Sequence, residues 1–253
     1  MDLNENSRLY HRFIINHPRL CYVSRNGTKI GVVTEISYGG LSLTPFIKPT
    51  TNTKKTISAS NSSALQTIEL HFLDRFITCQ IEERYSTLDK VGYQLTHEQT
   101  QVLSFLKEII PWIRAGAALS HLQKMEREGF EDELPDYLSF EGPIPIDIEW
   151  LGLDSQKLPN FSLNFSQDKV LYQLTKKNEQ LETLHNVWPG AESGNLRPTQ
   201  ALDSTILRNG LAVLVGLSAD VEMITYPQLI NSILELYEKY QQASGKELQK
   251  RTG

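Results

Sequence analysis

The dipeptide Asn26-Gly27 separates two stretches rich in β-branched and aromatic residues, and it strongly constrains how this chain can fold. Asn and Gly tolerate the positive φ that both central positions of a tight hairpin turn require. The flanking stretches, 19–25 and 29–36, therefore predict two antiparallel strands joined by a two-residue turn. Gly39-Gly40 marks a second break, and residues 39–44 predict a third strand.

Three more stretches continue the same pattern along the chain. Residues 67–73 and 76–85 alternate apolar and polar side chains, and residues 91–95 predict a sixth strand. Residues 45–63 contain many Thr, Ser, Asn and Lys and predict a long exposed loop. Six short strands of this kind favour a small antiparallel β-barrel.

The rest of the chain predicts a helix that closes the barrel and a second domain, so the fold class is α+β. Residues 96–111 carry apolar side chains at helical spacing, and Pro111 is expected to end or kink this helix. We place the domains at 1–113 and 114–253, with an acidic, proline-containing joint at 131–135. The second domain is expected to contain strands at 146–151, 160–165 and 169–175, helices at 115–127, 205–217 and 226–242, a loop at 189–198 and a frayed C-terminal end.

Composition argues against membrane insertion and nucleic-acid binding. Of the 253 residues, 40% are hydrophobic and 22% are charged, as in soluble globular proteins. The longest apolar run, Leu211 to Leu217, is far shorter than the ~20 residues of a membrane helix. The net charge of −5 divides into +2 over residues 1–113 and −7 over residues 114–253. The second domain is therefore a poor partner for nucleic acid or anionic lipid.

The cellular compartment follows from the cysteines and the first residues. Cys21 and Cys79 fall in predicted strands, where we expect buried, reduced thiols. The segment Met1 to Asn6 is polar and acidic, unlike a secretory signal. Both observations favour a cytoplasmic protein.

Two clusters near the N-terminus carry the chemistry. Arg8 and Arg12 are two planar donor forks, and each fork can bind a phosphate or the acceptor edge of a guanine with two hydrogen bonds. Glu35, Ser37 and Gly40 place a carboxylate, a hydroxyl and a glycine backbone at a sharp turn. Together the clusters predict a site for an anionic ligand that contains guanine.

These clusters resemble the PilZ domain, the bacterial receptor module for cyclic di-GMP, whose pattern is RxxxR followed by [D/N]xSxxG. Arg8 and Arg12 match the first part, and Ser37 and Gly40 match the second. Residues 91–106 also resemble the last strand and C-terminal helix of the family, so the resemblance covers roughly residues 8–113. The C-terminal half resembles no family that we recognise.

The resemblance implies a β-barrel that binds cyclic di-GMP without a metal or cofactor. It implies that Arg8 and Arg12 bind guanine edges and phosphates, and that Ser37 lies against the ligand. Gly40 would let the chain approach a flat base closely. The ligand would order the segment that holds the arginines, and a protein partner of unknown identity would read the change.

Glu35 departs from the family pattern, which has Asp or Asn at this position. A glutamate can accept the same hydrogen bonds from a guanine, but its carboxylate lies one methylene further out and has one more bond to order. Two outcomes stay open: Glu35 reaches a displaced guanine, or it pairs with Arg8 or Arg12 and blocks the site.

No catalytic motif stands out. The sequence contains no GxxxxGK[ST], no HExxH and no GxSxG, and its six histidines are scattered without metal-ligand spacing. We expect a non-enzymatic adaptor that senses cyclic di-GMP. The alternatives are a PilZ-like interaction module that binds no nucleotide and an enzyme within residues 140–250. Amphipathic helices at 98–110 and 226–242 fit a homodimer as well as they fit core packing.

Overall fold

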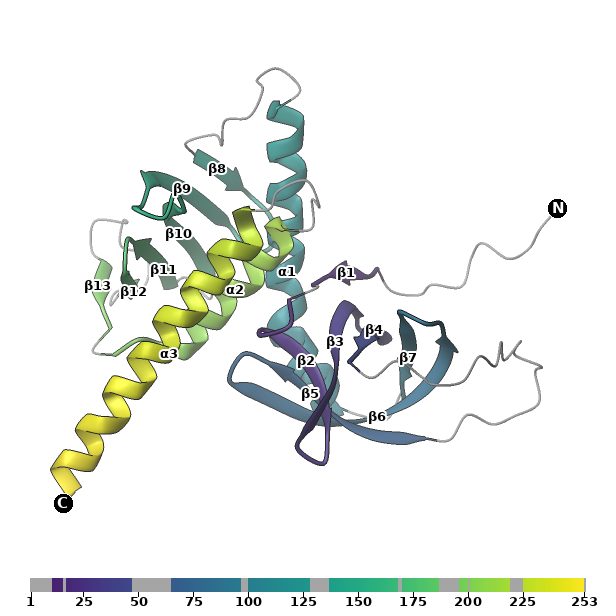
Figure 1. The fold of residues 1–253 in the computed structure, drawn as a ribbon. Coiled ribbons are helices and arrows are strands. Elements are labelled where there is room, and N and C mark those ends of the chain that lie inside the picture. Colours follow the sequence, from purple (N-terminus) through teal and green to yellow (C-terminus); the bar gives the residue numbers. More distant parts are fainter. Residues whose placement is uncertain are drawn as a thin grey trace. The chain divides into compact units, whose positions relative to one another are not determined.

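The chain folds into two compact units, Met1–Ile110 and Pro111–Gly253 (Figure 1). The expected joint at 131–135 and nearly all of the expected loop at 45–63 lie outside the described residues. The structure, a computed structural model, describes residues 11–15, 17–46, 65–96, 100–127, 137–167, 170–186, 196–199, 201–218 and 225–252.

The first unit is built around a closed, six-stranded antiparallel barrel. The sheet order is β1-β3-β2-β5-β6-β7-β4, and pairing of β4 with β3 closes the ring. The long strand β3 is shared: β2 pairs with its first half and β1 with its second half. The barrel predicted from the sequence is thus confirmed. The strands are β1 (Phe13–Ile14), β2 (Cys21–Arg25), β3 (Thr28–Ser37), β4 (Gly40–Pro45), β5 (Gln66–Phe72), β6 (Arg75–Ser86) and β7 (Val91–Leu95).

Local sequence explains the β2–β3 turn and the buried core of the barrel. Asn26 and Gly27 have φ values of 51° and 74°, the combination that a tight hairpin turn between β2 and β3 requires. Alternate side chains of the strands point inward and are buried. Cys79 is among the buried residues, and its burial raises the pKa of the thiol to about 12. The inward residues include Val23, Val33, Leu41, Leu43, Ile68, Leu70 and Ile81.

Helix α1 (Thr100–Arg127) includes the helix expected at 115–127 and most of the helix expected at 96–111, and it continues through Pro111 instead of ending there. Proline removes one hydrogen bond to the preceding turn. The apolar side chains on both sides of it, including Ile110 and Trp112, are buried, and their packing offsets that loss. In the first unit, Arg75 of β6 pairs with Glu108 of α1 and lies 5.9 Å from the ring centroid of Phe105. These contacts hold the start of α1 against the barrel.

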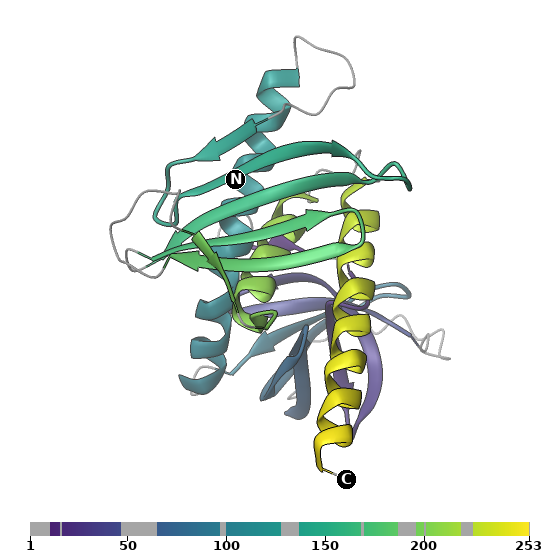
Figure 2. The same cartoon turned by 90° about the vertical axis from the view of Figure 1, so that its left-hand side faces the viewer.

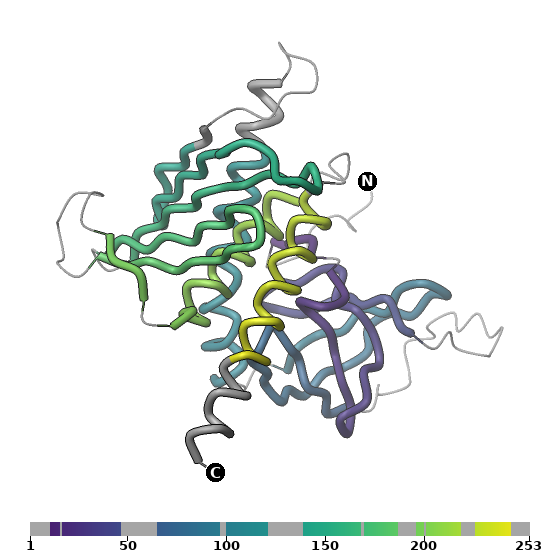
Figure 3. The backbone as a smooth tube through the Cα atoms, turned by 60° about the vertical axis from the view of Figure 1, so that its left-hand side comes forward, coloured from purple at the N-terminus to yellow at the C-terminus, as the bar shows by residue number. Residues whose placement is uncertain are grey.

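The second unit contains a six-stranded antiparallel sheet with the order β13-β12-β11-β10-β9-β8, so consecutive strands are neighbours (Figure 3). The three predicted strands are present as β9, β10 and β11. The sequence pattern missed the other three, and the loop predicted at 189–198 is wrong where β13 forms. The strands are β8 (Tyr137–Phe140), β9 (Ile146–Leu153), β10 (Pro159–Gln167), β11 (Val170–Lys177), β12 (Gln180–Asn186) and β13 (Leu196–Pro198).

Two helices, α2 (Ser204–Leu217) and α3 (Thr225–Thr252), lie on one face of this sheet, behind it in Figure 2. Helix α2 is buried from Ile206 to Leu217, and the buried stretch includes the polar residues Arg208 and Asn209. Helix α3 extends to Thr252 rather than fraying after 242, because its last residues include strong helix formers such as Ala, Lys, Glu, Leu and Gln. Within the described ranges, every helix is too short or too polar to span a bilayer.

Glycines let α1 and α2 approach each other within the second unit. A Cβ added at Gly116 of α1 would lie 1.9 Å from the carbonyl oxygen of Val213. A Cβ at Gly216 of α2 would lie 2.1 Å from the carbonyl oxygen of Ile113. The two helix backbones are therefore in direct contact, and a larger residue at either glycine would push them apart.

The core of the second unit contains a buried lysine. Lys176 of β11 is fully buried, and its Nζ donates a 2.8 Å hydrogen bond to Asp154 Oδ2. Asp154 Oδ1 also accepts hydrogen bonds from the backbone N–H groups of Gln156 and Leu158. Burial alone raises the pKa of Asp154, but these bonds outweigh it and hold the pKa below its ordinary value. The pair therefore stabilises the fold above that ordinary pKa, and the contribution is lost as the pH falls through the lower folded value.

We predict that Asp154→Asn lowers the free energy of unfolding by about 3 kcal/mol, because it leaves the Lys176 ammonium buried without a counter-ion. Asparagine keeps an oxygen for the two backbone bonds, so the change removes only the negative charge and the bond from Lys176. Urea unfolding at pH 7 measures the loss. Adding Lys176→Met to this variant removes the buried charge and should restore most of the stability. Equal instability of the single and double variants would contradict this explanation.

Candidate anion-binding site on the barrel

The short strand β1 fixes the position of Arg12. Phe13 pairs with Ile36 and Ile14 pairs with Glu35 of β3. The backbone N–H of Ile15 continues the ladder with a 3.0 Å bond to Thr34 O. Arg12, immediately before β1, is therefore held beside the end of β3. Sequence periodicity could not reveal a strand of two residues, and yet this strand joins the two clusters of the motif.

Four strands place a row of residues across the outer side of the barrel beside Arg12. Glu35 of β3 pairs with Ser42 of β4, Ser42 pairs with Gly92 of β7, and Gly92 pairs with Tyr85 of β6. Gly92 has no side chain, so the ring of Tyr85 lies over it; an added Cβ would be 2.0 Å from Tyr85 Cε1. The Tyr85 hydroxyl consequently reaches Ser42 Oγ at 2.9 Å.

Glu35 is the centre of a hydrogen-bonded cluster, which we call the Glu35 cluster: Arg12, Glu35, Ser42, Tyr85 and Lys90. Arg12 Nη1 donates to Glu35 Oε2 at 3.2 Å and to Ser42 Oγ at 3.1 Å. Ser42 Oγ also donates to Glu35 Oε2 at 3.2 Å. Lys90 Nζ donates to the other oxygen, Glu35 Oε1, at 2.6 Å. Each oxygen of the carboxylate thus has its own cation.

The electrostatics of the Glu35 cluster favour an ionised carboxylate and leave one positive charge in excess. Partial burial by itself raises the pKa of Glu35, but the hydrogen bonds from Lys90 and Arg12 outweigh it and lower the pKa. The Arg12, Glu35 and Lys90 side chains are 25%, 26% and 36% exposed, so solvent and an incoming anion can reach the cations. The contacts described for Arg12 use Nη1, and its fork has further N–H donors.

Ser37 and Gly40 lie next to the Glu35 cluster, in the turn that joins β3 and β4. Ser37 is buried, and its hydroxyl donates to Gly40 O at 3.1 Å and accepts from Gly39 N at 3.3 Å. A Cβ at Gly40 would lie 2.3 Å from Tyr93 O, so a glycine is needed for the close approach of β4 and β7. Both residues therefore have a structural role in the turn.

Of the residues predicted for the site, the structure brings Arg12 and Glu35 into contact and places Ser37 and Gly40 in the adjoining turn. Arg8 lies outside the described residues. The sequence analysis missed Ser42, Tyr85 and Lys90. Only the register of the barrel brings them to Glu35, and no local pattern carries that register.

A second polar cluster lies on strands β2 and β5. Ser24 Oγ is 2.8 Å from His71 Nε2 and also bonds to Glu69. In a Ser-His-acid hydrolase, the carboxylate holds the imidazole nitrogen that faces away from the serine. Here Glu69 Oε2 lies 3.6 Å from the same Nε2 that faces Ser24. This arrangement does not activate a serine nucleophile.

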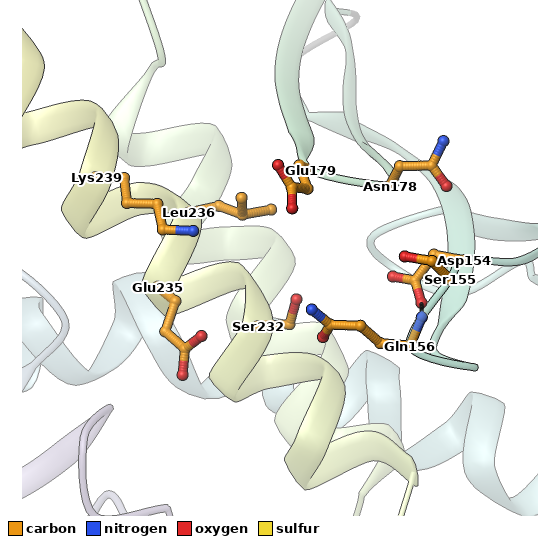
Figure 4. Close-up of a pocket in the computed structure, with 9 residues that line it drawn as sticks. All are labelled: Asp154, Ser155, Gln156, Asn178, Glu179, Ser232, Glu235, Leu236 and Lys239. Atoms are coloured by element: carbon orange, nitrogen blue, oxygen red, sulfur yellow. Dashed lines mark hydrogen bonds between the residues drawn. The ribbon is translucent and has the colours of Figure 1, made fainter.

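The second unit has a small polar pocket between α3 and the β9–β10 and β11–β12 turns (Figure 4). Its volume is about 40 Å³, which is room for a few water molecules rather than a nucleotide. Gln156 and Ser232 point toward each other across it. Within the described ranges, no group of three or more His, Cys, Asp or Glu side chains is arranged to hold a metal ion.

Comparisons with known proteins return structural similarities alone. No family model and no curated protein matches the chain. The chain is similar to the structure of the PilZ domain with c-di-GMP of YcgR from Escherichia coli, with 14% identity and a TM-score of 0.31, over 51% of this chain and 100% of that one. It is also similar to the uncharacterized Legionella protein Lpg0364, with 18% identity and a TM-score of 0.29, over 40% of this chain and 96% of that one. With TM-scores this low, neither similarity assigns a ligand to this chain.

We predict that Gly92→Ala destabilises the barrel by about 1 kcal/mol, because the new methyl group displaces the Tyr85 ring and breaks its bond to Ser42. Thermal unfolding of the purified variant measures the effect. The matched control is Gly92→Ala in a Tyr85→Ala background, where the space is open and the methyl group should cost little. An equal loss in both backgrounds would show that the tyrosine ring is not responsible.

Proposed function

We propose that this protein is a non-enzymatic, cytoplasmic receptor for cyclic di-GMP that passes the level of this second messenger to a protein partner. The observation that carries the proposal is the contact between Arg12 and Glu35, since it unites the two halves of the sequence motif at one place on the barrel. The excess positive charge of the Glu35 cluster suits a ligand with two phosphates.

The chemistry of the cluster fits the two parts of such a ligand. Arg12 can present its remaining N–H groups to a phosphate or to the O6 and N7 acceptors of a guanine. Arg8, four residues before Arg12 in the sequence, would supply the second fork. Glu35 offers carboxylate oxygens to the N–H donors of a guanine, at the position where the family pattern has Asp or Asn. Ser37 and Gly40 would contribute by shaping the turn beside the ligand.

A receptor also needs two states that a partner can distinguish. Contacts from Arg8 and Arg12 to one ligand would fix the segment before β1 against the barrel. A partner that prefers the fixed segment then binds more tightly when ligand is present, and the ligand binds more tightly when the partner is present. The partner is a second protein, or a second copy of this chain.

One observation favours a second candidate function, that of a PilZ-like interaction module without a nucleotide ligand. The Glu35 carboxylate already neutralises one of the two cations of the cluster and contacts both. An anionic ligand must compete with this internal anion.

We expect cyclic di-GMP to bind with a Kd in the low micromolar range, about −8 kcal/mol, in a calorimetric titration at fixed salt. The double variant Arg8→Ala, Arg12→Ala should show no binding, because both donor forks are lost. Arg25→Ala is the matched control: this exposed arginine lies at the far end of the β2–β3 hairpin and bonds to Gln66. Wild-type protein that produces no heat with ~100 μM ligand would contradict the receptor function.

Glu35→Asp distinguishes the two candidate functions. The shorter side chain restores the family pattern and retracts the carboxylate from the cations. If the wild type is an interaction module that has lost its ligand, this variant should gain saturable cyclic di-GMP binding in the same titration. If the wild type is a receptor, the variant should bind within about tenfold of it. Absence of binding in both proteins would show that the barrel has no cyclic di-GMP site.

A further inference from the structure

Lys90 is held in a defined position by the turn that joins β6 and β7. Thr87 N donates to Lys90 O at 2.8 Å, and Thr87 Oγ1 donates to the same oxygen at 3.0 Å. In return, Lys90 N donates to Thr87 Oγ1 at 3.0 Å. These reciprocal bonds fix the backbone immediately before β7, from which the Lys90 side chain extends.

The ammonium group of Lys90 faces the site and remains accessible. Its described contact is the 2.6 Å bond to Glu35 Oε1, and about a third of the side chain is exposed. An ammonium group has three N–H donors. One donor can therefore stay on Glu35 while another binds an oxygen of an incoming anion, or Glu35 can be exchanged for that anion.

The two oxygens of the Glu35 carboxylate bond to different partners, and this makes the exchange possible. Oε1 bonds to Lys90, whereas Oε2 bonds to Arg12 and Ser42. Release of Lys90 leaves the contacts of Oε2 in place, so the orientation of Glu35 does not depend on the lysine alone. A phosphate oxygen is a strong acceptor for a charged donor and can replace Oε1.

We propose that Lys90 is a ligand-binding residue of this site and that its ammonium group binds a phosphate of the ligand. This inference rests on the proposed function, because it assigns a further residue to the same cyclic di-GMP site. Lys90 and Arg12 would hold the phosphate from two sides of Glu35. The ligand would therefore contact two cations: Arg12, which precedes β1, and Lys90, which lies in the β6–β7 turn.

Lys90→Ala should weaken cyclic di-GMP binding about tenfold at low salt in a calorimetric titration, the usual effect of losing one charge-assisted bond. The difference from wild type should shrink as salt is raised, because the phosphate interaction of an exposed cation is screened. Lys90→Arg, which keeps the charge, should retain most of the affinity. Lys29→Ala is the matched control: this lysine lies over the Tyr22 ring, six residues before Glu35 and so about 20 Å away along β3.

A double-variant cycle separates direct contact from an effect through Glu35. If Lys90 binds phosphate, Lys90→Ala weakens binding in a Glu35→Gln background by at least the factor seen in the wild type, because no carboxylate then competes for the ammonium group. If Lys90 merely positions Glu35, its loss has no effect once the carboxylate is gone, and the inference is overturned. Equal melting temperatures of the variants establish that the loss is not due to unfolding.

The outcomes for this inference and for the proposed function are distinguishable. Wild type that binds, Arg12→Ala that does not, and Lys90→Ala that binds as wild type would overturn the role of Lys90 and leave the receptor function in place. Absence of binding by the wild type and by Glu35→Asp would overturn both.

Discussion

The pairing of β4 with β3 on one side and β7 on the other is the interaction on which the candidate site depends. It closes the barrel, and it sets Glu35, Ser42, Gly92 and Tyr85 in one row across four strands. A shift of one residue in any of these pairings would turn Glu35 or Ser42 to the opposite face. The same strand pairings thus close the barrel and align the residues of the site.

In the Glu35 cluster, one carboxylate contacts two cations. Two cations and one carboxylate are partly buried together, and the hydrogen bonds that lower the pKa of Glu35 also hold Arg12 and Lys90 in place. A ligand phosphate would replace a carboxylate oxygen rather than enter an empty site. The net gain in affinity is then the difference between two charge-assisted bonds, which is smaller than either bond alone.

The second unit combines close packing of apolar elements with one buried ion pair. Helices α2 and α3 cover one face of its sheet, and α2 is buried along nearly its whole length. Glycines at 116 and 216 permit the close contact of α1 with α2. Lys176 is fully buried in this unit, and its ammonium group donates a hydrogen bond to Asp154. The small polar pocket beside this pair has a volume of about 40 Å³, which is room for a few water molecules.

Local sequence was sufficient for the six barrel strands, the Asn26-Gly27 turn and the main strands and helices of the second unit, because alternation, helical spacing and turn residues are properties of neighbouring residues. It also pointed to Arg12 and Glu35 through a motif. It failed for β8 and β12, and for β1 and β13, which are too short to show a period and form because a longer strand offers its edge. It failed for Lys90 too, which is 55 residues from Glu35 along the chain. Such contacts are decided by strand register and barrel closure, and these depend on the packing of the whole sheet.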